Sequence, residues 1–128
     1  MLKTIDWNKS QTALQSTLKV IAAWAFGSAI DGKVRPGADA DIGILTESPL
    51  TFDEQLDLIG KIQTALQFEN VDLVVLNTAN PILRFEAVSG RRLYCRDTAK
   101  MAAFVSLTAR EYEDEVAQWQ HALQNYTK

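Results

Sequence analysis

The chain has 128 residues, of which 47% are hydrophobic and 23% charged, and its formal net charge is −3. This length and composition predict one globular domain over residues 1–128, with no room for a separate substrate-recognition domain. We expect no membrane segment and no signal peptide, because neither a run of about 20 apolar residues nor an apolar N-terminal segment occurs. The acidic balance argues against binding of extended nucleic acid, which depends on basic residues. A single cysteine, Cys95, fits a cytoplasmic protein.

The first elements predicted along the chain are a helix and a strand. Asn8 or Ser10 can cap a helix that ends near residue 19, with Leu14 and Leu18 on its inner face. Val20 to Phe26 is almost entirely apolar, which is typical of a central strand buried on both faces.

A loop and a second strand follow. Residues 29–38 contain Gly and Pro and read as a loop, and Asp39 to Leu45 alternates in a way that predicts a strand. Trp24, in the preceding strand, is expected to lie in the core.

The middle of the chain predicts another helix and a third strand. Thr51 and Glu54 form a capping-box pattern at the start of the helix. Val71 to Leu76 reads as a strand that Asp72 interrupts. The apolar residues expected on the inner face of the helix are Phe52, Leu56, Ile59, Ile62 and Leu66.

The last third of the chain predicts a short helix, an edge strand and a long helix. Asn80-Pro81 is a typical helix start and Gly90 a plausible stop, while the charges of Arg91 to Arg96 suit an edge strand. A helical pattern then runs over about residues 98–126, after a core of about residues 8–97. Its apolar seam, which can pack on a partner helix or on the protein's own domain, consists of Tyr112, Val116, Trp119, Leu123 and Tyr126.

Three aspartates interrupt apolar strands. Asp39 and Asp41 alternate with apolar residues, so both should point to one face of a strand, and Asp72 lies in the next strand. Each alone would fit an exposed strand end. An unpaired buried carboxylate is costly unless it binds a cation, and sites rich in oxygen select Mg²⁺ or Mn²⁺.

Gly27 and Ser28 make the cation site more specific. They follow the first predicted strand, where Gly27 lets the backbone come close to a triphosphate and the Ser28 hydroxyl can donate to it. Gly43 should leave space on the same face as Asp41. Together with the aspartates, this arrangement predicts nucleotidyl transfer, in which an acceptor attacks the α-phosphate of a nucleoside triphosphate.

The spacing resembles a known superfamily. Gly27-Ser28, ten residues, Asp39-x-Asp41 and then Asp72 is similar to the DNA polymerase β nucleotidyltransferases. The small size resembles the minimal nucleotidyltransferases (MNT), antitoxins encoded beside HEPN-domain toxins, and so does the segment NPILRFEAVSGRRLYCRD. This resemblance implies an α/β (α+β) fold, with a small mixed sheet flanked by helices and a long C-terminal helix.

The resemblance also implies roles for individual residues. Asp39 and Asp41 would hold two Mg²⁺ ions, and Asp72 would complete the shell of the catalytic metal and help to deprotonate the acceptor hydroxyl. Gly27 and Ser28 would bind the triphosphate of ATP. Basic residues that could neutralise the triphosphate, or simply lie on the surface, are Lys33, Arg35, Arg84 and Arg91.

The leading functional prediction is an enzyme that transfers AMP from ATP to a hydroxyl group. By the resemblance, the acceptor would be a tyrosine of a HEPN ribonuclease toxin, which is thereby silenced. One alternative is a catalytically weak antitoxin that blocks the toxin by direct binding through the terminal helix. Another is nucleotidyl transfer to a small molecule such as an aminoglycoside, or to RNA ends, with a homodimer building the acceptor site. The sequence leaves the acceptor, the base, the number of nucleotides transferred and the oligomeric state open.

Overall fold

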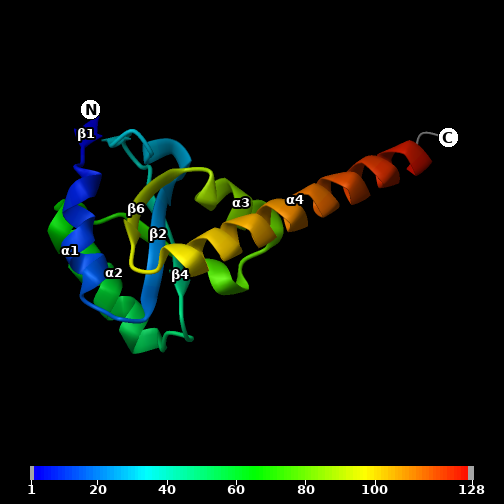
Figure 1. Ribbon diagram of the computed structural model, residues 1–128. Coiled ribbons are helices and arrows are strands. Elements are labelled where there is room, and N and C mark those ends of the chain that lie inside the picture. Colours follow the sequence, from blue (N-terminus) through cyan, green and yellow to red (C-terminus); the bar gives the residue numbers. More distant parts are fainter. Residues whose placement is uncertain (1, 127–128) are drawn as a thin grey trace.

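The computed structural model describes residues 2–126 and is built on a four-stranded sheet (Figure 1). Its strands are β2 (Val20–Phe26), β4 (Ala40–Thr46), β5 (Val71–Val75) and β6 (Arg91–Cys95), in the order β5-β4-β2-β6. β2 is antiparallel to β4 and β6, whereas β4 and β5 are parallel. The predicted mixed sheet is therefore confirmed.

β2 is the centre of the sheet. All seven of its residues are buried, and Trp24 is only 3% exposed, as its apolar sequence predicts. β6 is an edge strand, and its exposed arginines Arg91 and Arg92 suit that place because charges discourage pairing with another chain.

Two helices cover one face of the sheet, α1 (Ser10–Gln15) and α2 (Phe52–Leu66). The capping box at the start of α2 is present: the Thr51 hydroxyl accepts from the Glu54 N–H at 3.1 Å, and Glu54 Oε1 accepts from the Thr51 N–H at 2.9 Å. The buried residues of α2 are Leu58, Ile62 and Leu66.

Some residues predicted to lie on the buried faces of these two helices are exposed. In α2, Phe52 is 73% and Leu56 50% exposed, because the side of the helix that packs on the sheet is the one with Leu58, Ile62 and Leu66. In the first helix, Leu18 is 78% exposed. That helix ends at Gln15 because Ser16 turns back, with its N–H and hydroxyl both donating to the Ala13 carbonyl.

The other face is covered by α3 (Pro81–Val88) and α4 (Thr98–Tyr126), with the short 3₁₀ helix η3 (Leu76–Thr78) before them. Asn80 caps α3 as predicted, its Oδ1 accepting from the Leu83 N–H at 2.9 Å. Gly90 follows α3 for a different reason from the one expected. A Cβ there would lie 2.2 Å from the Ala25 carbonyl oxygen of β2.

One small sheet and two 3₁₀ helices were not predicted. β1 (Lys3–Thr4) and β3 (Lys33–Val34) form a separate antiparallel two-stranded sheet, and the 3₁₀ helices η1 (Trp7–Lys9) and η2 (Gly27–Ala29) precede α1 and follow β2. Strands of two residues carry no period that a sequence pattern could reveal.

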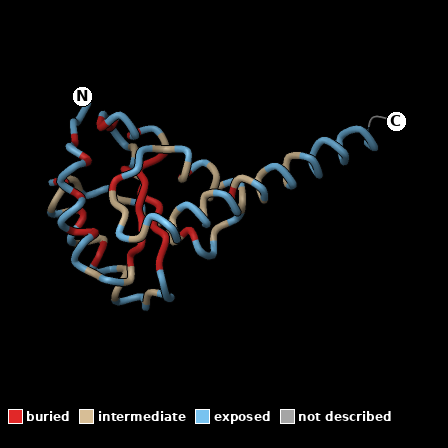
Figure 2. The backbone as a smooth tube through the Cα atoms, viewed as in Figure 1, coloured by how far each residue is buried: buried red, intermediate tan, exposed pale blue. Residues whose placement is uncertain are grey.

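α4 is the longest element and has the predicted extent. Its inner half packs against α3, where the rings of Phe85 and Tyr112 stack with centroids 4.0 Å apart. Its outer half extends away from the rest of the molecule and is exposed (Figures 1 and 2). Within residues 2–126, no helix has the length and apolar character needed to cross a bilayer.

Candidate active site

Asp41 and Asp72 lie side by side near the starts of two neighbouring strands, at one end of the sheet. They are directly paired residues of the parallel strands β4 and β5, and Asp41 also faces Phe26 at the end of β2. Because successive residues of a strand alternate between faces, Asp41 and Asp72 lie on the face covered by α3 and α4, whereas Ile42 and Leu73 pack toward α2. The strand order thus joins residues that are far apart in the sequence.

Gly27 connects the end of β2 to this pair. Its φ of +78° is in the left-handed region, and a Cβ built on it would lie 2.3 Å from Asp41 Oδ2. The Asp41 carboxylate fills the space that a side chain here would need, so the position favours glycine. The predicted contact of Gly27 with a triphosphate stays a prediction.

Ser28 is exposed in η2, and a hydrogen bond from a buried side chain fixes the position of this short helix. The buried indole of Trp7 donates from Nε1 to the Ala29 carbonyl at 2.9 Å. The N-terminal segment therefore fixes η2 while Ser28 remains exposed.

The charges that act most strongly on Asp41 are negative. The pKa of Asp41 is raised to about 6, mainly by burial and then by the charges of Asp72, Asp39 and Glu86, in that order of size. A hydrogen bond between the side chains of Asp41 and Asp72 adds to the rise in this pKa. Such a bond requires that one carboxyl holds a proton. The pair thus shows the strain of like charges brought together, which a bound cation would relieve.

Asp39 is close to the pair but does not complete a ready metal site. It is exposed, and it is anchored through its neighbour Ala40, whose N–H donates to the Asn70 carbonyl at 2.8 Å. Across residues 2–126, no three His, Cys, Asp or Glu side chains have an arrangement that would hold a metal ion. The assignment of Asp39, Asp41 and Asp72 as metal ligands stays a prediction.

Glu86 is a fourth acidic residue near Asp41, and sequence analysis missed it. It belongs to α3, next to Ala87, and a Cβ at Gly43 would lie only 3.1 Å from the Ala87 methyl group. The expected free space at Gly43 is therefore filled by α3 and by Leu76. The helical spacing of Leu83 and Ala87 marks the side of α3 that meets the sheet, but only the packing shows that Glu86 lies near Asp41.

Arg84 has a structural role. Its Nε donates to the Leu76 carbonyl at 2.7 Å, another nitrogen donates to the Asn77 carbonyl, and Nη1 pairs with Glu111 at 3.2 Å. The guanidinium group also lies 5.5 Å from the Phe104 ring. Arg84 thus ties η3 to α4, and its side chain is already engaged.

The other basic candidates are exposed. Arg91 Nη2 donates to Asn8 Oδ1 at 3.3 Å, while Lys33 and Arg35 lie exposed in the segment that leads to β4. Of the four, Lys33 and Arg35 are the nearest in sequence to Asp39, so they stay candidates for contact with a triphosphate.

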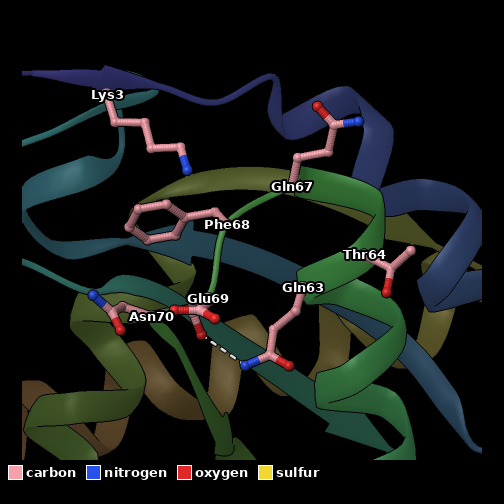
Figure 3. A pocket seen from close by; sticks show the side chains of 7 residues that line it. All are labelled: Lys3, Gln63, Thr64, Gln67, Phe68, Glu69 and Asn70. Carbon is pink, nitrogen blue, oxygen red and sulfur yellow. Dashed lines mark hydrogen bonds between the residues drawn. The ribbon is translucent and has the colours of Figure 1, made fainter.

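A pocket of about 420 Å³ lies beyond the start of β5 (Figure 3). Lys3 Nζ lies 5.3 Å from the centroid of the Phe68 ring, and Gln63 donates to the Glu69 carbonyl at 2.7 Å. Asn70 also lines it, but none of the predicted site residues does. The carboxylates belong to a separate, open surface.

Comparison with known proteins identifies the family. The family described as "Polymerase beta, Nucleotidyltransferase" matches residues 8–99. A probable protein adenylyltransferase, MntA of Haemophilus influenzae, is 40% identical over 42 residues, which are 33% of this chain and 37% of that relative.

Solved structures match nearly the whole chain. A crystal structure of a toxin–antitoxin with AMP-PNP has a TM-score of 0.75 and 26% identity, over 96% of this chain and 99% of its own. The structure of a tri-AMPylated Shewanella oneidensis HEPN toxin in complex with MNT antitoxin has a TM-score of 0.71 and 25% identity, over 95% and 96%. The expected resemblance to minimal nucleotidyltransferases and the expected fold are confirmed. The chain belongs to the polymerase β nucleotidyltransferase family.

Proposed function

We propose that this protein is an antitoxin that transfers AMP from ATP to a tyrosine hydroxyl group on a cognate HEPN ribonuclease toxin and thereby neutralises it. The observation that carries the proposal is the pairing of Asp41 with Asp72 beside Gly27, at the open end of the sheet. Two relatives that match almost the full chain support the reaction class, since one contains AMP-PNP and the other an AMPylated HEPN toxin.

The carboxylates have the chemistry that a hard cation requires. Asp39, Asp41 and Asp72 offer only oxygen ligands, and the pKa of Asp41 is raised first by burial and then by the like charges around it. We propose that Asp39 and Asp41 hold two Mg²⁺ ions, or Mn²⁺, and that Asp72 shares in holding the catalytic ion. Bound there, the ions would neutralise the triphosphate and the charge that develops during transfer.

The transfer itself needs a base and a site for the phosphates. Asp72 would accept the proton of the acceptor hydroxyl. The oxygen of that hydroxyl would form a bond to the α-phosphorus of ATP while the bond from the α-phosphorus to pyrophosphate breaks. Ser28, exposed on a loop fixed by Trp7, would donate its hydroxyl to the triphosphate. Gly27 would keep that loop against Asp41.

A protein acceptor suits this chain better than a small molecule. In the similar complex of a tri-AMPylated HEPN toxin with an MNT antitoxin the modified molecule is a protein, which supports a protein acceptor here. Cytoplasmic location is part of the proposal, because a toxin that cuts cellular RNA is met there.

The test is an incubation of the protein with labelled ATP, Mg²⁺ and the toxin encoded beside it. We expect label on the toxin with the wild type, and a loss of about 10³-fold or more in rate with Asp39→Asn/Asp41→Asn, since the metal-binding charges are removed. No transfer by the wild type, under conditions where the two proteins bind, would exclude the catalytic function.

A second candidate is direct blocking of the toxin, and the exposed outer half of α4 favours it. The same double variant separates the two functions in a growth assay with the toxin expressed. Rescue by Asp39→Asn/Asp41→Asn equal to that by the wild type would indicate blocking, whereas lost rescue with retained binding would indicate AMP transfer.

A further inference from the structure

The two halves of α4 have different surroundings. A helix rises about 1.5 Å per residue, so the 29 residues of α4 extend about 44 Å and the eight residues of α3 only about 12 Å. The inner half of α4 packs on α3 and β2. The outer half, residues 116–126, extends beyond them and is exposed apart from the half-buried Val116 (Figures 1 and 2).

An apolar stripe runs along this outer half. We call Val116, Trp119, Leu123 and Tyr126 the outer stripe; Trp119 is 62% and Tyr126 88% exposed. The stripe continues from Tyr112 at spacings of four and three residues, which is the repeat of helices that pack side by side. The face that meets α3 at Tyr112 is thus the face left exposed farther out, and it has the form that a second helix would cover.

The charges beside the stripe indicate the chemistry of that helix. The turn before it contains Glu113, Asp114 and Glu115, whereas residues 116–126 contain no Asp, Glu, Lys or Arg. A complementary partner therefore presents apolar side chains to the stripe and basic ones to the acidic turn. A protein that cleaves RNA carries basic residues for the phosphates of its substrate.

We propose that the outer stripe of α4 docks on an apolar helical surface of the ribonuclease toxin, with the acidic turn at residues 113–115 facing the basic residues around the toxin's RNA-binding surface. This inference rests on the proposed function for the identity of the partner. Docking of the outer stripe would hold the toxin while the toxin's acceptor hydroxyl reaches the carboxylates of the active site. The negative charges of residues 113–115 would also repel the phosphates of RNA from the toxin.

Pairing with a second copy of this chain is less favoured. In a parallel pair of α4 helices the two acidic turns would lie against each other, and like charges at that distance repel. An antiparallel pair avoids this contact, so the oligomeric state belongs in the test.

The test compares two double variants of the full chain by isothermal titration calorimetry against the purified toxin. Trp119→Ala/Tyr126→Ala removes the aromatic residues of the stripe, and Gln118→Ala/His121→Ala makes matched changes on the opposite side of the same helix. We expect toxin binding to weaken by roughly 30-fold or more with the stripe variant and by less than about threefold with the control. Circular dichroism checks that α4 remains helical in both.

The outcomes separate this inference from the proposed function. If Trp119→Ala/Tyr126→Ala binds the toxin as tightly as the wild type does, the docking surface is overturned. If that variant loses self-association in sedimentation while its affinity for the toxin is unchanged, the stripe is instead a contact between copies of this chain. If the wild type binds through the stripe yet transfers no AMP, the docking surface stands and the catalytic function fails. If the wild type does not bind the toxin at all, the docking surface is overturned.

Discussion

The two faces of the sheet are made from alternate residues of the same strands but serve different purposes. On the face toward α1 and α2, Ile42 of β4 is completely buried in a continuous apolar core. On the other face its neighbour Asp41 lies against Asp72 in a cluster of negative charge. One step along the strand thus separates a residue that stabilises the fold from one that strains it.

This difference shows how so small a domain can support a charged site. The face toward α1 and α2 gains from burial of apolar surface, at roughly 25 cal/mol per Å². The opposite face places like charges at the open strand ends, where solvent and a bound cation can offset them. Substitutions on the face toward α1 and α2 should therefore lower stability, whereas substitutions on the opposite face should mainly lower activity.

The largest expected loss of stability comes from the apolar face. Ile42→Ala should lower the free energy of unfolding by about 2–5 kcal/mol, because it leaves a cavity in a fully buried place. Urea unfolding measures the loss. A change below about 1 kcal/mol would contradict the view that this face carries the stability.

Gly27→Ala should affect both properties. The left-handed φ of Gly27 costs about 1–3 kcal/mol for other residues, and the new methyl group would push the Asp41 carboxylate away. We expect lower stability and a slower AMP transfer that added Mg²⁺ does not restore. Gly60→Ala is the matched control. It lies in α2 with open space around its Cβ position, so it should stabilise by up to about 1 kcal/mol.

Asp41→Asn should have the opposite effect on stability from Ile42→Ala. The pKa of Asp41 is raised to about 6 in the folded protein, so its contribution favours folding at low pH and is lost as the pH rises from about 4 to 6. Above pH 6, without metal, the variant should be more stable by about 1 kcal/mol once solvent screening is allowed for.

Thermal unfolding at pH 4 and pH 7.5 measures this effect, with Asp114→Asn on exposed α4 as the control. Addition of Mg²⁺ should raise the Tm of the wild type at pH 7.5 and change that of Asp41→Asn much less. Equal Tm values for wild type and Asp41→Asn at both pH values would contradict the charge strain described for this face.

The helix caps allow the smallest test, one on each face. Thr51→Ala and Asn80→Ala each remove a side chain that accepts from a backbone N–H at the start of α2 or α3, at a cost of about 1 kcal/mol. Only α3 carries Glu86 and packs on Gly43 beside the carboxylates. We therefore expect slower AMP transfer from Asn80→Ala and unchanged transfer from Thr51→Ala; equal transfer rates would show that α3 does not position the site.

The sequence predicts the strands and helices well where a pattern is long or continuous. The seven apolar residues of β2 could only be a buried strand, and the capping pattern at Thr51 marks the start of α2 correctly. The pattern fails where the tertiary structure decides. Phe52 has helical apolar spacing but lies off the buried side of α2, and Leu18 follows the end of α1, so both are exposed.

The site shows the same division. The acidic pattern identifies Asp41 and Asp72, but their direct contact depends on β5 pairing with β4, which no local pattern gives. Gly27 was predicted from its place after a strand, and only the structure reveals the Asp41 carboxylate in the space its side chain would occupy. Glu86 could not be found in advance, because a solvent-facing glutamate on a helix looks ordinary until the helix is packed.

The hydrogen bond from Trp7 to Ala29 also makes this molecule its own optical reporter. Indole emission shifts in wavelength when the N–H loses its partner or the ring meets water, and this ring is only 1% exposed. In a Trp24→Phe/Trp119→Phe background, where Trp7 is the one remaining tryptophan, titration with ATP should change the emission of Trp7 if the loop that carries Ser28 tightens around the phosphates. Occupancy of the loop could then be followed by light alone, without label or partner.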